Sequence, residues 1–484
     1  MSTHQPRTGS SLDAEAFAQA GASARLDQAA RPACPGLPGP ETAPRVLLLT
    51  SGLGSGHARA AEAIQLAWRA ADPQVTVHTL DFWLLMAPDV AETIHQSYLR
   101  LVTEHPALYD RVYRLDQRLW RSLLAGGAVP ESLRLVLRAF SRDAFRAPLR
   151  RGGNRMDRWL FLALLASFKG RAWGWPGGAL RGGLLSWACR RLTLRLGVRI
   201  RAFGPDLIVV NEMWPAVLLS PLKASGAIAA PVVGVLTDYG VHDLWVQPGV
   251  DHYCVASTEM VVALRAAGVE GSRISVTGIP LMTGFRRPPS MEEARRALGI
   301  EPSHAVILLL GGGLGLGLEA VAKQLAASGT DAQLLVVAGR NQAVLESLRP
   351  LTAASSRLRV YPWTEHMELF MRAADVVVGK PGGVTVTEAM ACGRPLVATH
   401  SLRGQEGFNV RFLEAQGVGR LVPEEEDLGA TVAALLADRQ QLARMQGRAW
   451  ELGRRDSAER VVGVAMTLTG ALAHSRSHSE AVHK

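Results

Sequence analysis

Short apolar runs alternate with longer amphipathic stretches along most of the chain, from Arg45 to about residue 470. In the first half, these runs predict β-strands at Val46–Thr50, Val75–Leu80, Leu207–Val210, Val232–Leu236, Tyr253–Ala256 and Ser275–Thr277. In the second half, they predict strands at Ala305–Leu310, Gln333–Ala338, Arg359–Tyr361, Val376–Val378 and Pro395–Thr399. Strands that alternate with helix-length stretches are typical of an α/β fold with doubly wound parallel sheets.

The pattern divides the chain into two Rossmann-like domains that face each other across a cleft. Gly284–Ser290 contains two arginines and two prolines and predicts a linker. We therefore expect a first domain at 45–285 and a second at 286–470. Residues 1–44 predict a disordered tail, and residues 471–484 a loose one. Ligands of such sheets bind at the carboxyl ends of strands.

An insertion at about residues 84–203 interrupts the first domain. Its second half, about 142–201, is rich in arginine and contains Trp159, Trp173, Trp175 and Trp187. Cations and tryptophans around a short apolar run favour contact with lipid headgroups, so we expect this part to associate with a membrane. Two alternatives stay open: a solvated helical insertion, and a surface for single-stranded nucleic acid.

The composition favours an anionic partner. The 484-residue chain has a net charge of +10, which suits nucleic acid, an anionic membrane or a phosphorylated substrate. The four scattered cysteines include no C-x-x-C pair, so they predict neither a disulfide framework nor a structural zinc site. The N-terminus lacks a signal-peptide pattern, and no apolar run reaches the ~20 residues of a membrane span. We expect a cytoplasmic protein.

A cationic glycine loop, Lys380-Pro-Gly-Gly383, follows the predicted strand Val376–Val378 and precedes a helix expected to begin at Thr385. Glycines let the backbone approach a ligand, and a helix N-terminus attracts anions, so this arrangement predicts a phosphate or diphosphate site. Gln405 and Glu406 follow one strand later and could bind hydroxyl groups. Together these features indicate a nucleotide-sugar.

A second glycine loop, Thr50–His57, joins the first strand to a helix. It is neither a P-loop nor the G-x-G-x-x-G fingerprint, although Asp81 after the next strand leaves a dinucleotide site as an alternative. His57 would face the cleft, where an imidazole could deprotonate a hydroxyl nucleophile. The alternative is that His57 merely begins the helix.

At this point the chain resembles a known family. Gly52–Ile64 and the Lys380–Asn409 segment look like those of monogalactosyldiacylglycerol synthases and bacterial processive diacylglycerol glycosyltransferases. Thr237–Trp245, Gly339-Arg-Asn341 and Tyr361–Met367 extend the resemblance. The chain departs from the family pattern at Leu53 and Ser55, at Asn211-Glu212, and in the insertion.

The resemblance implies a GT-B fold, an inverting mechanism and a UDP-sugar donor. In the first domain, it makes His57 the catalytic base or an acceptor-positioning residue, and it places Asp238 and His242 on the acceptor side. In the second domain, it implies that the donor is bound by Gly311, Gly312, Gly313, Arg340, Trp363, Lys380, Gly382, Gly383, Glu388, Gln405 and Glu406. The glycines would wrap the diphosphate, Lys380 and Arg340 would neutralise charge, Glu388 would bind the ribose, and Gln405 and Glu406 the sugar.

Several of these residues have simpler interpretations. Thr385-x-x-Glu388 has the pattern of a capping box, in which the glutamate serves the helix start. Lys380 and Arg340 could be surface cations, Trp363 a core residue, and Asp238 and His242 ordinary loop residues. Gln405 and Glu406 could form a polar turn.

The chain contains no D-x-D motif, so we expect no metal ion and no other cofactor. The resulting hypothesis is a peripheral enzyme on the inner face of the cell membrane. It transfers glucose or galactose from a UDP-sugar to diacylglycerol or a glycolipid, with no nucleic-acid partner. The alternatives are a lipid-II-type N-acetylglucosaminyltransferase, a UDP-sugar epimerase, and a basic membrane- or RNA-binding protein with a decayed nucleotide site.

Overall fold

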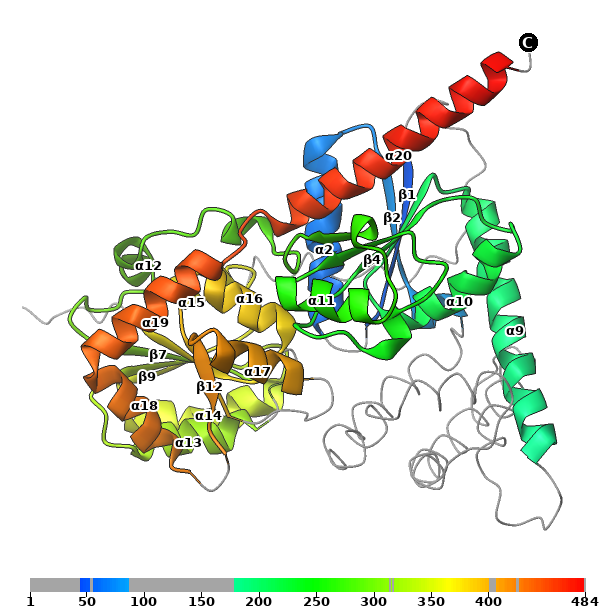
Figure 1. Ribbon diagram of the computed structural model, residues 1–484. Helices are drawn as coiled ribbons and strands as arrows, with labels where there is room; N and C mark the ends of the chain where they lie inside the picture. Colours follow the sequence, from blue (N-terminus) through cyan, green and yellow to red (C-terminus); the bar gives the residue numbers. More distant parts are fainter. Residues whose placement is uncertain are drawn as a thin grey trace, which may run out of the picture. The chain divides into compact units, whose positions relative to one another are not determined.

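The structure is a computed structural model (Figure 1). It describes residues 44–52, 55–86, 178–312, 315, 317–399, 406–423 and 426–482. The predicted N-terminal tail up to residue 43 and most of the Arg/Trp-rich insertion, including its four tryptophans, lie outside the side chains described. The same is true of Gly313 and Gln405.

The first lobe is built on a six-stranded parallel sheet with the strand order β2-β1-β3-β4-β5-β6. Its strands are β1 (Arg45–Thr50), β2 (Thr76–Asp81), β3 (Leu207–Val210), β4 (Val232–Val235), β5 (His252–Val255) and β6 (Ile274–Val276). Its helices are α2 (Ser55–Ala71), α3 (Phe82–Met86), α9 (Gly178–Phe203), α10 (Met213–Ala224) and α11 (Thr258–Ala266). Strands β1, β3 and β4 are almost wholly buried, as expected of parallel strands covered by helices on both faces.

The second lobe repeats this architecture, with the strand order β12-β11-β10-β7-β8-β9. Its strands are β7 (Val306–Leu310), β8 (Gln333–Val337), β9 (Leu358–Tyr361), β10 (Val376–Gly379), β11 (Leu396–Ala398) and β12 (Gly419–Leu421). Its helices are α12 (Met291–Ala297), α13 (Leu318–Ala327), α14 (Gln342–Ala354), α15 (Met367–Ala373), α16 (Gly383–Ala391), α17 (Gly407–Ala415), α18 (Leu428–Ala437) and α19 (Arg439–Leu452). Two parallel sheets with interleaved helices confirm the predicted fold class.

Each sheet reverses its strand order at one point. In the first lobe the chain runs from β1 out to β2 and then returns to place β3 on the other side of β1. In the second lobe it runs from β7 through β8 to β9 and then returns to place β10 beside β7. The crevice at the carboxyl end of such a switch point is where open α/β sheets bind ligands. The topology therefore selects the loops after β1, β3, β7 and β10.

The last long helix, α20 (Ser457–Val482), packs on the first lobe although it follows the second in sequence. Val461, Val462 and Ala465 are buried in one core with residues of α2 and β1. The predicted boundaries place residues up to 470 in the second domain and residues 471–484 in a loose tail. In the structure, Ala458–Leu468 of α20 pack on the first lobe, and the helix continues to Val482.

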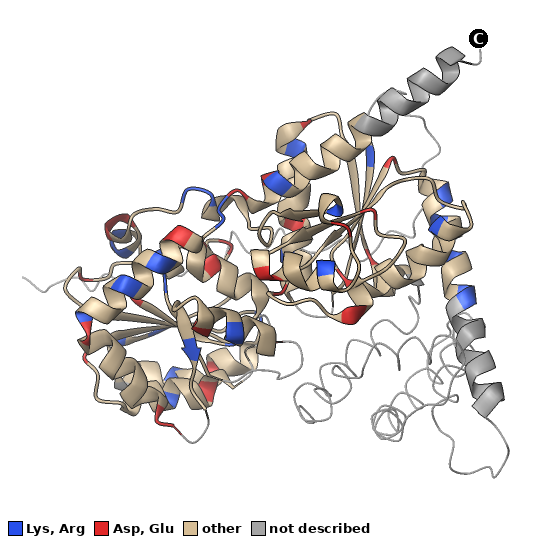
Figure 2. Ribbon diagram, viewed as in Figure 1, with Lys and Arg blue, Asp and Glu red and all other residues tan. Residues whose placement is uncertain are grey.

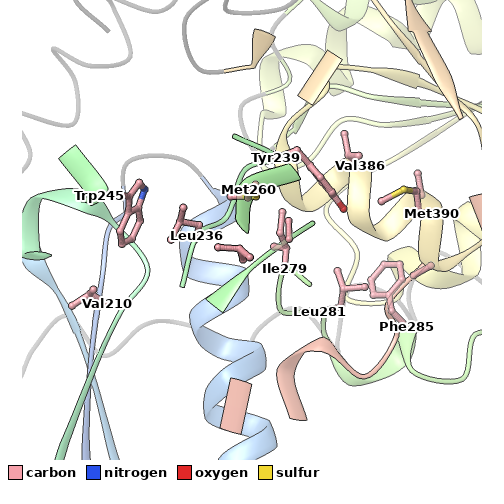
Figure 3. Packing of buried hydrophobic residues seen from close by; sticks show 14 of the residues in the cluster. Val210, Leu236, Tyr239, Trp245, Met260, Ile279, Leu281, Phe285, Val386 and Met390 are labelled. Atoms are coloured by element: carbon pink, nitrogen blue, oxygen red, sulfur yellow. The ribbon is translucent and has the colours of Figure 1, made fainter. Parts of the chain in front are cut away.

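The two lobes share a continuous apolar core. Tyr239, from the loop after β4, points toward α16 of the second lobe, where Val386 and Met390 lie (Figure 3). Its ring stacks on Phe412 of α17, with 4.0 Å between ring centroids. The loop after β4 is therefore packed against the second lobe. None of the helices described is long and apolar enough to cross a membrane.

Candidate active site

His57 lies in the first turn of α2, at the switch point of the first lobe. Its Nδ1 is 3.0 Å from Thr237 Oγ1, in the loop after β4, and its carbonyl accepts a hydrogen bond from Asn211 Nδ2 (2.7 Å). Burial lowers the pKa of His57, so the imidazole is neutral near pH 7. In the tautomer in which Nδ1–H donates to Thr237, Nε2 is free to accept a proton.

A second group of polar side chains surrounds the ends of β2 and β3. Asp81 accepts a hydrogen bond from the Gly52 N–H (2.5 Å), which holds the glycine loop in place. It also accepts one from the Trp83 N–H (2.8 Å), which stabilises the first turn of α3. Both bonds lie within the first lobe, and they do not favour the alternative in which Asp81 is the acid of a dinucleotide site. Glu212 is the N-cap of α10 and accepts from the Trp214 N–H. Burial, with a smaller contribution from Asp81, raises the pKa of Glu212 to about 8.

Two glycine loops flank the switch point of the second lobe. Gly311 and Gly312 follow β7 and lead to α13, whose N-cap is Gly317 in the left-handed conformation (φ 72°). Gly382 is the N-cap of α16, which begins at Gly383. Neither N-cap has a side chain that bonds the first-turn amides, so both helix starts present N–H groups suited to an anion.

Lys380 and Glu406, predicted to bind diphosphate and sugar, are in direct contact. Lys380 Nζ lies 2.7 Å from Glu406 Oε1, and the glutamate side chain is only 4% exposed. Glu406 is the N-cap of α17, so this ion pair joins the loop after β10 to the start of that helix. The pair places a cation and a carboxylate beside the glycine loop.

Glu388 lies within α16 and is not part of a capping box. That alternative required a helix beginning at Thr385, whereas α16 begins at Gly383 and its N-cap lacks a side-chain bond. Burial raises the pKa of Glu388 to about 8; Arg59, from α2, lowers it, and Glu368 raises it. The carboxyl is thus close to a cation of the first lobe.

Trp363, after β9, is held between cations of both lobes. The guanidinium carbon of Arg340 lies 4.4 Å from the centroid of its ring, and that of Arg59 lies 5.6 Å away. Trp363 Nε1 donates to Glu365, which also pairs with Arg59 (2.8 Å). Trp363 is half-buried at this contact and is not a core residue.

The carboxyl edges of the two sheets meet at the starts of α2 and α16. A Cβ at Gly56 would lie 3.5 Å from Val384, and one at Gly383 would overlap the carbonyl oxygen of Thr237. Only glycine at 383 therefore allows this approach. The contact brings the His57 helix and its Thr237 partner against the start of the proposed anion site.

Asp238 and His242, predicted on the acceptor side, have distinct local partners. Asp238 Oδ1 accepts from Asn409 Nδ2 of α17 (2.9 Å). His242 Nδ1 accepts from the Leu244 N–H (3.1 Å) and caps the 3-10 helix η2 (Asp243–Trp245). Asp238 thus lies where the lobes meet, whereas His242 orders its own loop. Their roles toward an acceptor remain predictions.

Sequence reasoning did not assign four residues that the structure places here: Thr237, Arg59, Asn409 and Glu212. Thr237, Arg59 and Asn409 stand inside segments that already carried the family resemblance, and Glu212 inside a departure from it. The only signal in the sequence was the position of these residues inside those segments. Their roles depend on partners that lie on other helices and loops. Among the described residues, no three His, Cys, Asp or Glu side chains gather to form a metal site.

Comparison with known proteins agrees with this architecture. Residues 188–281 match the family model of monogalactosyldiacylglycerol (MGDG) synthase, and residues 312–438 match that of glycosyl transferases group 1. A processive diacylglycerol beta-glucosyltransferase of Bacillus subtilis is 30% identical over 268 residues, which are 55% of this chain and 69% of the relative. The same-named protein of Bacillus pumilus is 27% identical over 292 residues, or 60% of this chain and 75% of the relative.

The solved structure of MurG from Acinetobacter baumannii has a TM-score of 0.51 at 13% identity and covers 88% of this chain and 99% of its own. The fold is of the GT-B class, and the family matches together with this fold define a two-lobed glycosyltransferase. Within that class, the chain belongs to the family of monogalactosyldiacylglycerol synthases and processive diacylglycerol glucosyltransferases. The predicted resemblance is confirmed.

Proposed function

We propose that this glycosyltransferase moves a hexose, glucose or galactose, from a UDP-sugar to diacylglycerol or a glycosyldiacylglycerol at an anionic membrane surface. The main support for the proposal is that the switch point of the first sheet lies next to that of the second. The start of the His57 helix lies against α16, whose N-terminus has no side-chain cap. A proton acceptor and an anion site then face one reacting centre.

In the second lobe, the N–H groups at the start of α16 and the ammonium of Lys380 would hold the diphosphate. These groups are fixed in place before reaction, so they stabilise the charge that develops on departing UDP. Glu388 would accept hydrogen bonds from the ribose, and Glu406 from the sugar. Arg340 and Trp363 form the edge of the site on the β8–β9 side.

In the first lobe, His57 Nε2 would take the proton of the acceptor hydroxyl as its oxygen attacks the anomeric carbon. The C–O bond to the sugar forms on the face opposite UDP, and the bond to the diphosphate breaks, which inverts the anomeric centre. Buried Asn211 Oδ1 and Thr50 Oγ1 have no hydrogen-bond partner within the described part of the chain. Both stand at the ends of central strands, where an acceptor hydroxyl would satisfy them.

The described part of α9 supports the membrane component of the proposal. Leu194 (59% exposed) and Val198 (57% exposed) stand one turn apart among arginines, the blue positions on this helix in Figure 2. Leu84 of α3, which packs beside α9, is also exposed. Exposed apolar residues flanked by cations suit the boundary between headgroups and acyl chains of an anionic bilayer. We propose a peripheral enzyme on the inner face of the cell membrane.

The test is a transfer assay with radiolabelled UDP-glucose and UDP-galactose and vesicles that contain diacylglycerol. We expect a labelled glycolipid from one donor with the wild-type protein, and about a hundredfold less or lower still with His57→Ala. A labelled prenyl pyrophosphate, or an epimerised free sugar nucleotide, would instead assign a different reaction. Failure to bind UDP in calorimetry would contradict the donor assignment itself.

A further inference from the structure

Asn409, in the first turn of α17, bonds segments of both lobes with a single side chain. It is fully buried. Its Oδ1 accepts from the Tyr239 N–H (2.8 Å), and its Nδ2 donates to Asp238 Oδ1 (2.9 Å) and to the Pro381 carbonyl (3.0 Å). Both N–H groups and the oxygen of the amide are therefore used.

Only an amide of this size fits the three partners. An aspartate would place a second carboxylate beside Asp238 and would lose both donors. A leucine would leave the Tyr239 N–H and the Pro381 carbonyl without this bond in a buried place, which is unfavourable because neither group could bond water instead. The side chain thus recognises both the loop after β4 and the loop after β10.

Asn409 shares the start of α17 with Glu406, which pairs with Lys380. The first turn of one helix therefore contacts the proposed diphosphate loop at Lys380 and at Pro381. Further contacts hold Tyr239 to the same lobe, because its hydroxyl lies 2.9 Å from Thr387 Oγ1 and its ring stacks on Phe412. The second lobe thus contacts the segment Thr237–Gly240 at successive residues.

That segment in turn holds the catalytic base. Thr237 Oγ1 is 3.0 Å from His57 Nδ1, one residue before the Asp238 that Asn409 binds. An unbroken series of hydrogen bonds and one peptide link therefore runs from the Pro381 carbonyl through Asn409 and Asp238 to Thr237 and His57. Each step is a direct contact within the described residues.

We propose that Asn409 is a positioning residue that holds Asp238 and the Thr237–Gly240 segment against the donor loop, so that His57 is oriented for transfer only while the lobes are docked. The inference rests on the proposed function, because it assigns His57 the role of base. Asn409 acts through Asp238 and Thr237 and does not itself touch the reacting atoms. The consequence is a variant that binds UDP but transfers slowly.

The experiment is a double-mutant cycle with Asn409→Asp and Asp238→Asn. Asn409→Asp should lower kcat at least tenfold and leave the UDP dissociation constant within about twofold. In the Asp238→Asn background the same change should cost several-fold less, because the two carboxylates no longer oppose each other. Equal fold-changes in both backgrounds, or a kcat unaffected by Asn409→Asp, would overturn the proposal.

Gln416→Glu is the matched control. Gln416 ends the same helix, and its amide donates to Glu259 of the first lobe at an exposed contact (3.2 Å) away from the donor loop. The same amide-to-acid change there should leave kcat within about twofold. A tenfold loss in this control would show that any weakened lobe contact slows transfer, and would remove the specific role of Asn409.

Two further measurements keep the outcomes separate. If Asn409→Asp fails to fold, as judged by circular dichroism and UDP binding, Asn409→Ser removes the same bonds without adding charge and enters the same cycle. Wild-type protein that forms no glycolipid would refute the proposed function. Wild-type transfer with additive variant effects would refute only the inference about Asn409.

Discussion

The ammonium of Lys380 and the carboxylate of Glu406 lie 2.7 Å apart, so two groups predicted to bind different parts of a nucleotide-sugar bind each other. The glutamate is almost fully buried, and the lysine is 29% exposed. A buried carboxylate beside the anion loop orients the lysine but also opposes a second negative charge. If the loop binds a diphosphate as proposed, we expect donor binding to redistribute the bonds of this pair.

Lys380→Ala should weaken UDP binding by about ten- to a hundredfold, the range expected for one lost hydrogen bond to a charged group. Glu406→Gln should leave the affinity for UDP within a few-fold while removing the preference for UDP-glucose over UDP. Titration calorimetry with both ligands measures each effect. Lys323→Ala, which breaks an exposed ion pair in the same lobe, is the control. Unchanged affinity in Lys380→Ala would return this residue to a structural role.

Loss of the base should affect chemistry and not donor binding. His57→Ala should lower kcat by about 10²- to 10⁴-fold, the usual contribution of a general base, with unchanged UDP affinity. Because burial lowers the pKa of His57 below its ordinary 6.5, activity should persist at pH 6.5 and be lost only at lower pH. His304→Ala, an exposed histidine before β7, is the matched control. An acid limb centred above pH 6.5 would contradict this assignment.

Glu212 should make stability depend on pH. Its folded-state pKa of about 8 lies above the ordinary 4.5, so the folded protein binds more protons between these values. The free energy of unfolding should therefore fall as pH rises from 4.5 to 8, by at most about 1.4 kcal/mol per pH unit from this group. Below 4.5 its contribution is fully present, and above 8 it is lost.

In Glu212→Gln this slope should disappear, so the variant should gain stability relative to wild type as pH rises. Urea unfolding at pH 5, 6, 7 and 8 measures the difference. Asp427→Asn, at the N-cap of α18, controls for the loss of a carboxylate at a helix start. If the difference in the free energy of unfolding between Glu212→Gln and wild type stayed constant with pH, Glu212 would be ionised in the folded protein.

Transfer should not require a divalent cation. The chain has no D-x-D pair, and in the proposed site Lys380 and the start of α16 would supply the positive charge that a metal could otherwise provide at the diphosphate. We expect the same initial rate in excess EDTA as in added Mg²⁺ or Mn²⁺. If EDTA abolished transfer and either ion restored it, a metal ion would be needed to stabilise the departing UDP, and this prediction would be wrong.

Leu194→Asp should reduce binding to phosphatidylglycerol vesicles by about tenfold or more, because an exposed leucine that enters the bilayer contributes roughly 1.5–3 kcal/mol. Val262→Asp adds the same charge at a 69% exposed apolar position on α11 and should bind as wild type does. Vesicle sedimentation compares the two, with UDP affinity as a check on folding. Equal losses in both variants would indicate a general charge effect.

The strands could be predicted closely because buried parallel strands are continuous apolar runs that propensity and burial both favour. The predicted strand Leu207–Val210 has the same first and last residues as β3. The sequence missed β12 (Gly419–Leu421), which has three residues and an exposed arginine at its centre, so no apolar run marks it. The start of α16 was placed two residues late, because a glycine pair suggested a loop where Gly382 in fact caps the helix.

The site was predictable only as a set of loops. Motifs placed Lys380, Gly383 and His57 at the ends of strands, which parallel topology brings to one edge of each sheet. Contacts across elements, such as Lys380 with Glu406 or Asp238 with Asn409, depend on how helices and loops pack. Local sequence carries no record of those partners, which is why Asn409 and Thr237 received no role.

The placement of α20 has a consequence for biosynthesis. A ribosome makes the strands of the first lobe early, yet Val461, Val462 and Ala465, which seal the core behind α2, emerge only after the whole second lobe. N-terminal domains commonly fold first during translation. The apolar face of the lobe that bears His57 therefore stays uncovered until the ribosome has also made the second lobe and the start of α20.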